Sequence, residues 1–402
     1  MVGLAATLAG GTAAHADGPG TTIRVSVRTD GSEGEFFGSR EPGIGADGRY
    51  VVFSSGDELA ADDTNALDDV YLHDTVTGVT ELISVGPDGT SVLGSSSLPQ
   101  VSADGRYVAF ASDAPLTADS DWTGGTFVRD RQTGVTTRVG PASSIFEGPD
   151  MSPDGNFVVF GTVRDAVPAD RNFSEDVYLW NRTTGQLSLV SAGPDGTAPI
   201  GDSGSPTVSD NGRYVTYRTR ASDLNGGVFG TRNVLTDRRT GTTTIVSPLV
   251  DPDGGDVGVP VISGDGHFVA YSQNDAGSAT DVKLWQRTTG TTEVASVSAS
   301  GESGTGVSLS PRISRTGRYV AFWSSARDLV AGPPSAPMSV YRFDRQAGRN
   351  VVAMTPPDDA FYGSEKCDIS DDGRFVATET KSATLVADDT NGQFDVFRTQ
   401  VS

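Results

Sequence analysis

A ten-residue segment occurs seven times along this chain, and this repeat limits the possible fold more than any other feature. The copies align without gaps: IGADGRYVVF, VSADGRYVAF, MSPDGNFVVF, VSDNGRYVTY, ISGDGHFVAY, ISRTGRYVAF and ISDDGRFVAT. Their turn glycines are Gly48, Gly105, Gly155, Gly212, Gly266, Gly317 and Gly373, spaced 50 to 57 residues apart. Periods of this length are typical of propeller blades, whereas solenoid repeats are mostly shorter.

Each unit is predicted to form four antiparallel strands. The Asp-Gly or Asn-Gly turn is the strongest short hairpin signal, and the strand that follows it alternates apolar with other residues, as in Arg106–Phe110. A polar loop then leads to a third strand such as Asp69–Leu72. A D-x-x-T-G turn, at Asp74–Gly78 in the first unit, precedes a fourth strand rich in Thr and β-branched residues. Four antiparallel strands make one propeller blade.

The two ends of the repeat array complete each other. The seventh unit stops after its third strand, FDVFRTQVS, and residues 21–31 (TTIRVSVRTDG) resemble a fourth strand that has no partners nearby. We therefore expect residues 22–27 to pair beside residues 394–399, because a closed ring leaves no exposed sheet edge. The sequence predicts an all-β fold, a single seven-bladed β-propeller domain over residues 17–402.

The units also resemble a known family. The segment Ser152–Phe160 (SPDGNFVVF), followed by DVYL and a D-x-x-T-G turn, looks like the WD40-like (PD40) repeat of TolB-type propellers. The resemblance covers residues 21–402 and implies the propeller fold. It implies little about function, because such blades occur in periplasmic scaffolds, peptidase-associated domains and lyases.

Charge narrows the range of partners. With 52 acidic and 30 basic residues the chain has a formal charge of −22, which repels nucleic-acid backbones and anionic headgroups and suits cations or basic partners. No segment of 18 consecutive apolar residues is present, so no membrane span is predicted. We expect neither a nucleic-acid partner nor a membrane span, and we expect a monomer.

The N-terminus predicts export. Residues 1–16 hold a short apolar run that ends in Ala14-His15-Ala16, an A-x-A cleavage signature, although the usual basic start is missing. We interpret residues 1–16 as a truncated signal peptide and expect a secreted or envelope-associated protein. The single cysteine, Cys367, allows no intramolecular disulfide and is expected to be buried.

A D-x-N-x3-D pattern recurs just before the third strand and is intact in units one, three and seven. It comprises Asp63, Asn65 and Asp69; Asp170, Asn172 and Asp176; and Asp389, Asn391 and Asp395. Alternating Asp and Asn oxygens on a tight loop can bind Ca²⁺. The alternative is that these side chains cap the loop through Asx-turn hydrogen bonds. Calcium is the one cofactor that the sequence suggests.

No catalytic constellation is recognisable. The GDSGSP segment around Ser203 imitates a serine-protease motif, but the accompanying histidine pattern lies at His15, within the predicted signal peptide. Ser203 itself is expected in a loop that links two units. His73 and His267 belong to different units and different strand types, so a shared zinc site is not expected. Paired carboxylates at the centre of the ring stay open as an alternative.

Tryptophans offer candidates for ligand contact. Trp180 and Trp285 occupy the same place in their third strands, and we expect them to pack between blades rather than to form a carbohydrate platform. Trp122 lies in an acidic loop and is the candidate for contact with a partner.

In this topology the two longer connections of each unit lie on one side of the disc, which we call the loop-rich face, and the two short turns lie on the turn face. Rigid scaffolds commonly place function in variable loops. The favoured function is therefore a secreted, non-catalytic scaffold that binds an extracellular protein or glycan through its acidic loop-rich face. The alternatives are an extracellular hydrolase or lyase with carboxylates at the central channel, and a purely structural envelope protein.

Overall fold

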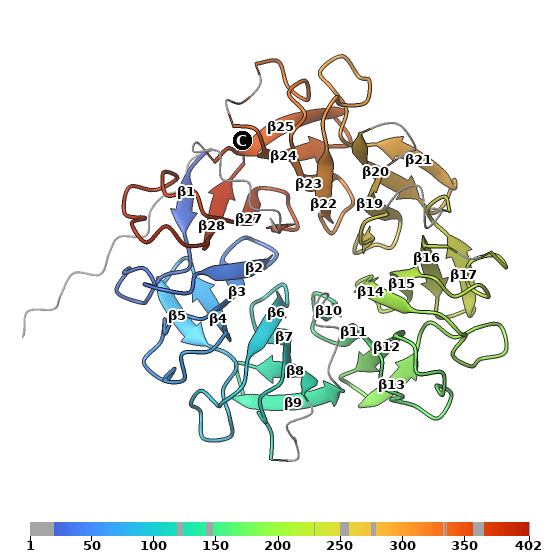
Figure 1. Cartoon of the computed structure of the whole chain (residues 1–402), viewed down its shortest axis with the longest axis horizontal. Coiled ribbons are helices and arrows are strands. Elements are labelled where there is room, and N and C mark those ends of the chain that lie inside the picture. Colours follow the sequence, from blue (N-terminus) through green and yellow to red (C-terminus); the bar gives the residue numbers. More distant parts are fainter. Residues whose placement is uncertain are drawn as a thin grey trace, which may run out of the picture.

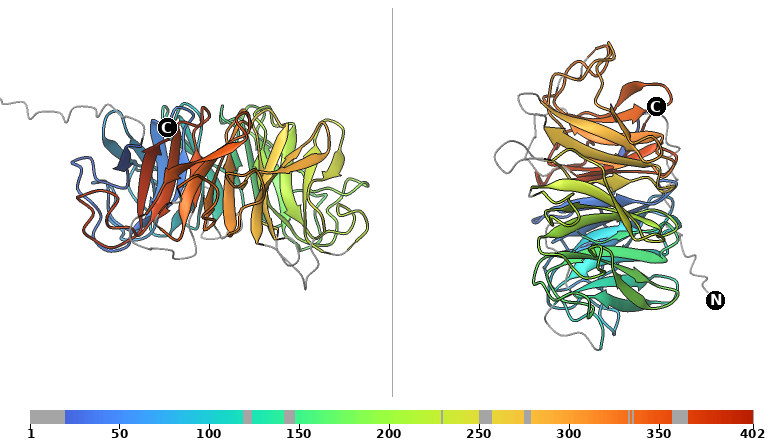
Figure 2. Two further views of the ribbon diagram at one scale, coloured as in Figure 1. Left: turned by 90° about the horizontal axis from the view of Figure 1, so that it is seen from above. Right: turned by 90° about the vertical axis from the view of Figure 1, so that its right-hand side faces the viewer.

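The computed structural model describes residues 20–118, 124–141, 148–228, 230–249, 257–274, 279–332, 334, 336–356 and 366–401. These residues form seven four-stranded antiparallel sheets arranged as blades around a central axis (Figure 1). Seen from the side, the blades make a flat disc (Figure 2). The predicted all-β, seven-bladed propeller is confirmed. The predicted signal peptide, residues 1–16, lies outside the described residues.

The first three blades follow the order of the sequence, with the first strand of each nearest the axis. Blade 1 contains β2 (Ser39–Ile44), β3 (Tyr50–Ser55), β4 (Asp69–Asp74) and β5 (Val79–Leu82). Blade 2 contains β6 (Ser96–Val101), β7 (Tyr107–Ser112), β8 (Gly125–Asp130) and β9 (Val135–Gly140). Blade 3 contains β10 (Asp150–Met151), β11 (Phe157–Thr162), β12 (Asp176–Asn181) and β13 (Gln186–Leu189).

The remaining blades repeat this arrangement. Blade 4 contains β14 (Ser203–Val208), β15 (Tyr214–Thr219), β16 (Arg232–Asp237) and β17 (Thr242–Ile245). Blade 5 contains β18 (Val261–Ile262), β19 (Phe268–Asn274), β20 (Thr280–Gln286) and β21 (Thr291–Val294). Blade 6 contains β22 (Ser308–Ile313), β23 (Tyr319–Ser324), β24 (Ser339–Asp344) and β25 (Arg349–Met354). Blade 7 contains β26 (Cys367–Ile369), β27 (Phe375–Thr380) and β28 (Asp395–Gln400).

The seventh blade takes its fourth strand from the other end of the chain. Strand β1 (Thr22–Arg24) pairs antiparallel with β28, with Thr22 opposite Thr399 and Arg24 opposite Phe397. Beyond the strand, the Val25 N–H donates to the Val396 carbonyl at 2.8 Å. The two strands lie side by side in Figure 1. The predicted closure of the ring by the N-terminal strand is confirmed, although the strand is shorter than the predicted residues 22–27, because Val27 forms a bridge with Glu33 instead.

Each turn glycine packs on an aromatic ring of the preceding blade. A Cβ atom at Gly105 would overlap the ring of Tyr50, and one at Gly212 would overlap the ring of Phe157. The same relation holds at Gly48, Gly155, Gly266, Gly317 and Gly373, whose neighbours are Phe375, Tyr107, Tyr214, Phe268 and Tyr319. These glycines have a positive φ as well. The repeated segment thus encodes both the hairpin and the contact between blades.

The core lies between blades rather than in one central mass. One cluster joins Val52 and Leu72 of blade 1 to Val108, Phe110 and Phe127 of blade 2, and similar clusters join other neighbouring blades. Trp180 and Trp285 are buried in such clusters, which confirms their expected packing role. Cys367 is buried, as expected.

Two further observations complete the fold. Ser203 is the first residue of β14 rather than part of a loop, and its hydroxyl is hydrogen-bonded to Thr219 Oγ1 at 2.8 Å. The prediction that it lies in a linking loop is wrong, because the pairing of the inner strand begins at this residue. Among the described residues, no helix is long and apolar enough to cross a membrane.

Candidate functional site

The first D-x-N-x3-D loop connects β3 to β4 and forms a closed hydrogen-bond network. Asp63 accepts hydrogen bonds from the Asn65 N–H and the Tyr71 hydroxyl. The Asn65 amide nitrogen donates to Asp69 Oδ2 at 2.8 Å, and the Ser84 hydroxyl donates to Asp69 Oδ1. All four carboxylate oxygens therefore accept a hydrogen bond from the protein itself.

The third unit repeats this network almost bond for bond. Asn172 Nδ2 donates to Asp176 Oδ2 at 2.9 Å, the Ser191 hydroxyl donates to Asp176 Oδ1, and the Tyr178 hydroxyl donates to Asp170. In both loops the Asn side-chain oxygen accepts an N–H two residues later, as an Asx turn requires. This is the bonding pattern of the turn-forming alternative. The calcium alternative stays a prediction.

The loop of blade 7 is built differently, because two residues of the network are replaced. Phe397 stands where the first and third units have Tyr71 and Tyr178, so the ring offers no hydroxyl to Asp389. Arg24 stands where those units have Leu82 and Leu189. In blade 7 a charged guanidinium thus takes the place of the neutral tyrosine hydroxyl as the partner of the first aspartate of the motif.

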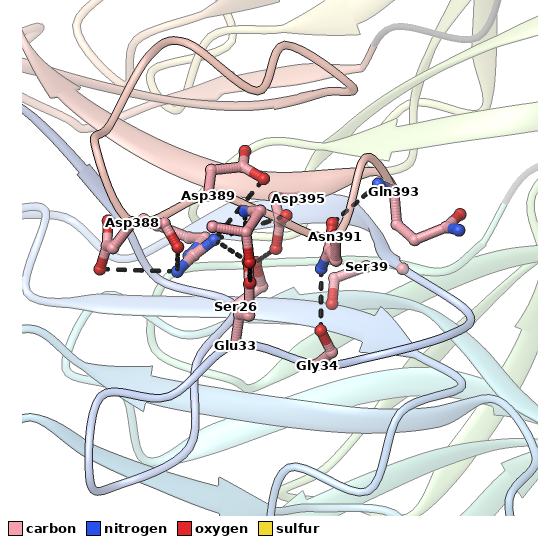
Figure 3. Close-up of polar contacts among 12 residues, drawn as sticks. Ser26, Glu33, Gly34, Ser39, Asp388, Asp389, Asn391, Gln393 and Asp395 are labelled. Atoms are coloured by element: carbon pink, nitrogen blue, oxygen red, sulfur yellow. Dashed lines mark hydrogen bonds and ion pairs between the residues drawn. The ribbon is translucent and has the colours of Figure 1, made fainter.

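Arg24 lies among four carboxylates. Its guanidinium is 2.5 Å from Glu33 and 3.5 Å from the exposed Asp388. It is 3.8 Å from Asp389 and 3.9 Å from Asp395. Figure 3 shows these four side chains close together. Glu33, Asp389 and Asp395 each offer an oxygen, and these oxygens lie within 4.8 Å of one another. In the part of the chain that the structure describes, they form the one group of three side chains that could share a metal ion. Glu33 was not predicted from the sequence, because it lies on the link to blade 1.

Asn391, the middle residue of this third motif, binds backbone instead of Asp395. Its Nδ2 donates to the Gly34 carbonyl at 2.9 Å, and its Oδ1 accepts the Gln393 N–H at 2.7 Å (Figure 3). Asp395 accepts the Ser26 hydroxyl at 2.6 Å. The structure therefore joins all three residues of the motif in blades 1 and 3, whereas in blade 7 it brings Asp389 and Asp395 together with Glu33 and leaves Asn391 bonded to backbone.

Burial makes the last carboxyl of each motif hard to ionise. It raises the pKa of Asp69 and of Asp176 to about 7, against hydrogen bonds from Ser and Asn that lower it. Burial raises the pKa of Asp395 to about 6, and the nearby Arg24 limits the rise. Divalent cations bind deprotonated carboxylates, so protons compete with any cation at these loops.

Trp122, the predicted partner contact, lies outside the described residues. The described parts of the loop-rich face nevertheless show where apolar side chains meet solvent. Exposed fractions there reach 85% at Phe173 and 86% at Ile200, 69% at Phe36 and 60% at Phe37, and 66% at Leu93. They lie in four separate connections of the loop-rich face, and the exposed apolar side chains described on the turn face are the smaller Val76, Val79 and Val135. Large exposed apolar groups mark interaction sites.

The buried Asp57 carboxylate fixes the loop that exposes Phe36 and Phe37 to solvent. The N–H groups of Glu35 and Phe36 donate to Asp57 Oδ1 at 3.0 and 2.8 Å, and those of Phe37 and Gly38 donate to Oδ2 at 3.2 and 3.0 Å. Asp57 is itself only 5% exposed. Four N–H donors on one carboxylate fix the loop, so both rings are displayed at little further entropic cost on binding.

Phe173 is displayed at the expense of backbone strain. Its φ is +58°, a left-handed conformation in which bulky residues are rare, whereas the equivalent positions hold Ala66 and Gly392. Asn172 Nδ2 donates to the Pro199 carbonyl at 2.6 Å and so links the loop that carries Phe173 to the connection that carries Ile200. Strained residues cluster at functional sites.

The central channel is the second candidate site. A cavity of about 500 Å³ is lined by the inner strands of the blades and the residues just before them. Six residues before the turn glycine, six units have a buried proline and the seventh has Cys367; the prolines are Pro42, Pro99, Pro149, Pro206, Pro260 and Pro311. This fixed offset is a sequence signal that the sequence analysis missed.

The residues on either side of these prolines face the channel. At four of the six, the preceding residue has a positive φ: Glu41, Leu98, Ser205 and Ser310. The register of the inner strand shifts at the same four places. The inner strands of these four units thus each contain a bulge of one residue at the channel.

The channel carboxyls act as bridges between blades. Asp368 Oδ2 accepts the Ile44 N–H at 2.9 Å, and Asp150 Oδ2 accepts the Val208 N–H at 2.8 Å. Burial raises the pKa of Asp150 to about 6 and that of Glu379 to about 7. Glu379 also accepts the Glu41 N–H. Raised pKa values thus occur both in the channel and in the rim loops, so they favour neither the catalytic nor the binding hypothesis.

No family model matches the chain, and no curated protein matches its sequence. Solved structures do match. The chain is similar to an oligogalacturonate lyase from Vibrio parahaemolyticus, with a TM-score of 0.56 and 12% identity over 96% of this chain and 99% of that one. It is also similar to the β-propeller domain of the Trilobed protease from Pyrococcus furiosus, with a TM-score of 0.55 and 9% identity over 92% and 94%.

TolB from Acinetobacter baumannii matches less well, with a TM-score of 0.42 and 15% identity, and the match covers 70% of this chain and 58% of TolB. The Pyrococcus domain is described as having an open velcro topology, whereas β1 closes the ring in this chain. Identities this low speak for the fold alone. The matches to the lyase and to the Pyrococcus domain, which cover nearly the whole chain, support the β-propeller fold.

Proposed function

We propose that this protein is a secreted, non-catalytic binding module that recognises a basic protein through its loop-rich face. The observation that carries the proposal is the display of Phe36, Phe37, Leu93, Phe173 and Ile200 on that face. Aromatic and aliphatic side chains held out on pinned loops are the anchors from which protein interfaces are built.

The distribution of charge supports a basic partner. Exposed carboxylates are numerous in the described loops of this face: Asp30, Glu35, Glu58, Asp62, Asp68, Asp88, Asp113, Asp165, Asp195, Asp202, Asp223, Glu302 and Asp388. Basic side chains are fewer there: Arg28, Arg164, Arg171, Arg220, Arg327 and Lys381. A negative face attracts cationic partners and speeds their association at low ionic strength.

The turn face differs, because many of its carboxylates are paired with arginines. Arg49 contacts Asp74 at 2.7 Å, and Arg106 contacts Asp130 at 2.8 Å. The corresponding pairs Arg213–Asp237 and Arg318–Asp344 repeat the contact in blades 4 and 6. The negative field of the disc therefore concentrates on the loop-rich face.

Site-specific photo-crosslinking tests this proposal. A benzophenone side chain is placed at position 36, 173 or 200 and, as the control, at Val76 or Val135 of the turn face, which are 56% and 55% exposed. In the extracellular fraction of the source cells we expect the same adduct from all three loop positions and none from the controls. Adducts of equal yield from both faces, or none from the loop-rich face, would contradict the proposal.

The nature of the adduct separates the protein alternative from the glycan alternative. An adduct that protease degrades, and that does not form when salt is added before irradiation, supports a basic protein, because salt screens exposed charge interactions. An adduct that survives protease but is removed by glycosidases would replace it with a glycan.

Calcium binding at the D-x-N-x3-D loops is a second proposal, and blade 7 is the place that favours it. The oxygens of Glu33, Asp389 and Asp395 lie within 4.8 Å of one another, whereas the carboxylates of blades 1 and 3 are occupied by internal donors. Arg24 already stands among these oxygens, so a cation has to compete with it. Arg24→Leu removes the competing guanidinium, so calcium should bind this variant more tightly than the wild-type protein.

A further inference from the structure

Arg312, on the inner strand β22, places a guanidinium with few hydrogen bonds in the central channel. Its side chain lines the cavity of about 500 Å³, and its one hydrogen bond in the described structure runs from Nη1 to the Pro311 carbonyl at 3.1 Å. Among the described residues, no carboxylate lies within ion-pair distance of its guanidinium. Lys366 of the same cavity differs, because it contacts Glu41 at 3.3 Å.

The two carboxyls nearest to Arg312 are held by backbone donors instead. Asp368 accepts the N–H groups of Ile44 and Ile369, each at 2.9 Å, and Asp150 accepts that of Val208. Arg312 is close enough to lower the pKa of both carboxyls, although burial raises each of them more. The Arg312 guanidinium therefore keeps donors that these two carboxyls do not use, and an acceptor from outside could bind them.

One part of the cavity wall is apolar. Val259, Val261 and Ile262 of blade 5, with Leu309 and Ile313 of blade 6, line the same cavity as Arg312. Charged and polar side chains, among them Asp150, Asp368 and Lys366, line the rest. A pocket of roughly 300–1,000 Å³ that combines apolar walls with placed polar groups is typical of small-molecule sites. A ligand that fits here has one acceptor end and an apolar body.

We propose that the channel binds a small monocarboxylate with an apolar body, whose carboxylate accepts paired hydrogen bonds from the Arg312 guanidinium. The planar guanidinium matches a carboxylate in a bidentate geometry that an ammonium cannot form. A single negative charge is favoured over several, because the acidic loop-rich face repels polyanions. This site is separate from the binding surface proposed above and does not depend on it.

Calorimetric titration with hexanoate tests the proposal, with hexanamide as the neutral probe of the same size. We expect hexanoate to bind the wild-type protein and hexanamide to bind at least ten times more weakly, since the bond to a charged acceptor is worth about 1.5–3 kcal/mol. Arg312→Gln should weaken hexanoate binding about 10- to 100-fold for the same reason. The hexanoate affinity of Arg312→Lys should lie between those of the wild-type protein and Arg312→Gln, because lysine keeps the charge but loses the planar pair of donors.

Two further variants make the result specific. Arg171→Gln removes an exposed arginine outside the channel and should leave binding unchanged. Val261→Phe keeps the guanidinium and fills the apolar side of the cavity, so it should abolish binding even if Arg312→Gln does not fold. No binding of millimolar hexanoate to the wild-type protein would overturn the proposal, and so would equal binding to Arg312→Gln or Val261→Phe.

Discussion

At the residue scale, residues at equivalent positions of the repeat have different structural roles. Tyr71 and Tyr178 close their loops with a hydroxyl, whereas the third copy replaces the tyrosine by Phe397 and supplies Arg24 from the opposite end of the chain. The loop that joins the two ends is thus held by charge rather than by neutral donors. A buried charge network of this kind depends strongly on each of its members.

Replacing Arg24 by the leucine of the other units tests this dependence. We expect Arg24→Leu to cost about 3–5 kcal/mol of stability, because it leaves buried carboxylates without their counter-ion. We further expect millimolar Ca²⁺ to restore part of the melting temperature of the variant and to affect the wild-type protein less. Thermal melts with EDTA and with Ca²⁺ measure both effects.

The matched comparison is Leu82→Arg in blade 1, where Tyr71 already serves Asp63, so no gain in stability is expected. If Ca²⁺ changes neither the wild-type protein nor Arg24→Leu, the D-x-N-x3-D loops of all three blades are turn structures, and calcium drops out of the functional hypotheses.

At the element scale, the blade is a hairpin repeat whose turn doubles as a contact surface. The turn glycine of each blade lies against an aromatic ring of the preceding blade, and arginines stack on that ring: Arg49 and Arg131, for example, lie 4.8 and 5.3 Å from the centre of the Tyr50 ring. Stacking of this kind adds attraction without any contact at the channel.

Two glycines of blade 3 separate the backbone effect from the packing effect. Gly155 and Gly185 have φ values of +68° and +69°, but only Gly155 has a ring, that of Tyr107, in the place of a Cβ. We expect Gly185→Ala to cost about 1–2 kcal/mol from the left-handed backbone. Gly155→Ala should cost about 1–3 kcal/mol more from overpacking. Chemical denaturation measures both, and equal losses would contradict the packing role.

Elements with a local signal could be predicted from the sequence, whereas individual side-chain contacts between distant loops could not. The Asp-Gly turns and alternating strands are local patterns, so the blades were predictable. The closure was predictable although it joins the two ends of the chain, because the last unit lacks a fourth strand and the first residues supply one. The bond of Asp57 to the Phe36 N–H joins loops on two connections, and the pairing of Arg24 with Asp389 spans the whole chain. No periodicity encodes such pairs. The proline of each inner strand was predictable from its fixed offset, although its effect on the channel was not.

At the scale of the whole molecule, stability depends on where charge is buried. Burial raises the pKa values of Asp69, Asp176 and Glu379 to about 7 and those of Asp150 and Asp395 to about 6. The folded state therefore binds protons more tightly than the unfolded state between about pH 4 and pH 7. In this window the free energy of unfolding falls as the pH rises.

We expect the melting temperature to be several degrees higher at pH 5.5 than at pH 8 at constant ionic strength. Below about pH 4 the trend should reverse, because the paired carboxyls Asp74 and Asp130, whose pKa values are lowered to about 2, then start to lose their charge. Scanning calorimetry over this range measures the profile. A melting temperature that rises steadily from pH 5.5 to pH 8 would show that these buried carboxyls do not govern stability.

Ring closure is the other property of the whole molecule. Deleting residues 1–27 removes β1 and the bonds that follow it, and we expect the melting temperature to fall by more than about 5 °C, since it exposes the edge of β28 and part of the core. Deleting residues 1–19 alone should leave the melting temperature unchanged. If both truncations melt alike, the ring does not depend on β1.

The same closure has a consequence in time. The hydroxyls of Thr22 and Thr399 lie 2.9 Å apart, although 377 positions separate them along the chain. At roughly 5–20 residues per second, a ribosome needs about 20 to 75 seconds to make the second partner after the first. Throughout that interval β1 is a strand without a sheet, and the last blade cannot be completed. Whatever protects that strand from pairing elsewhere has to act on the newborn chain for tens of seconds.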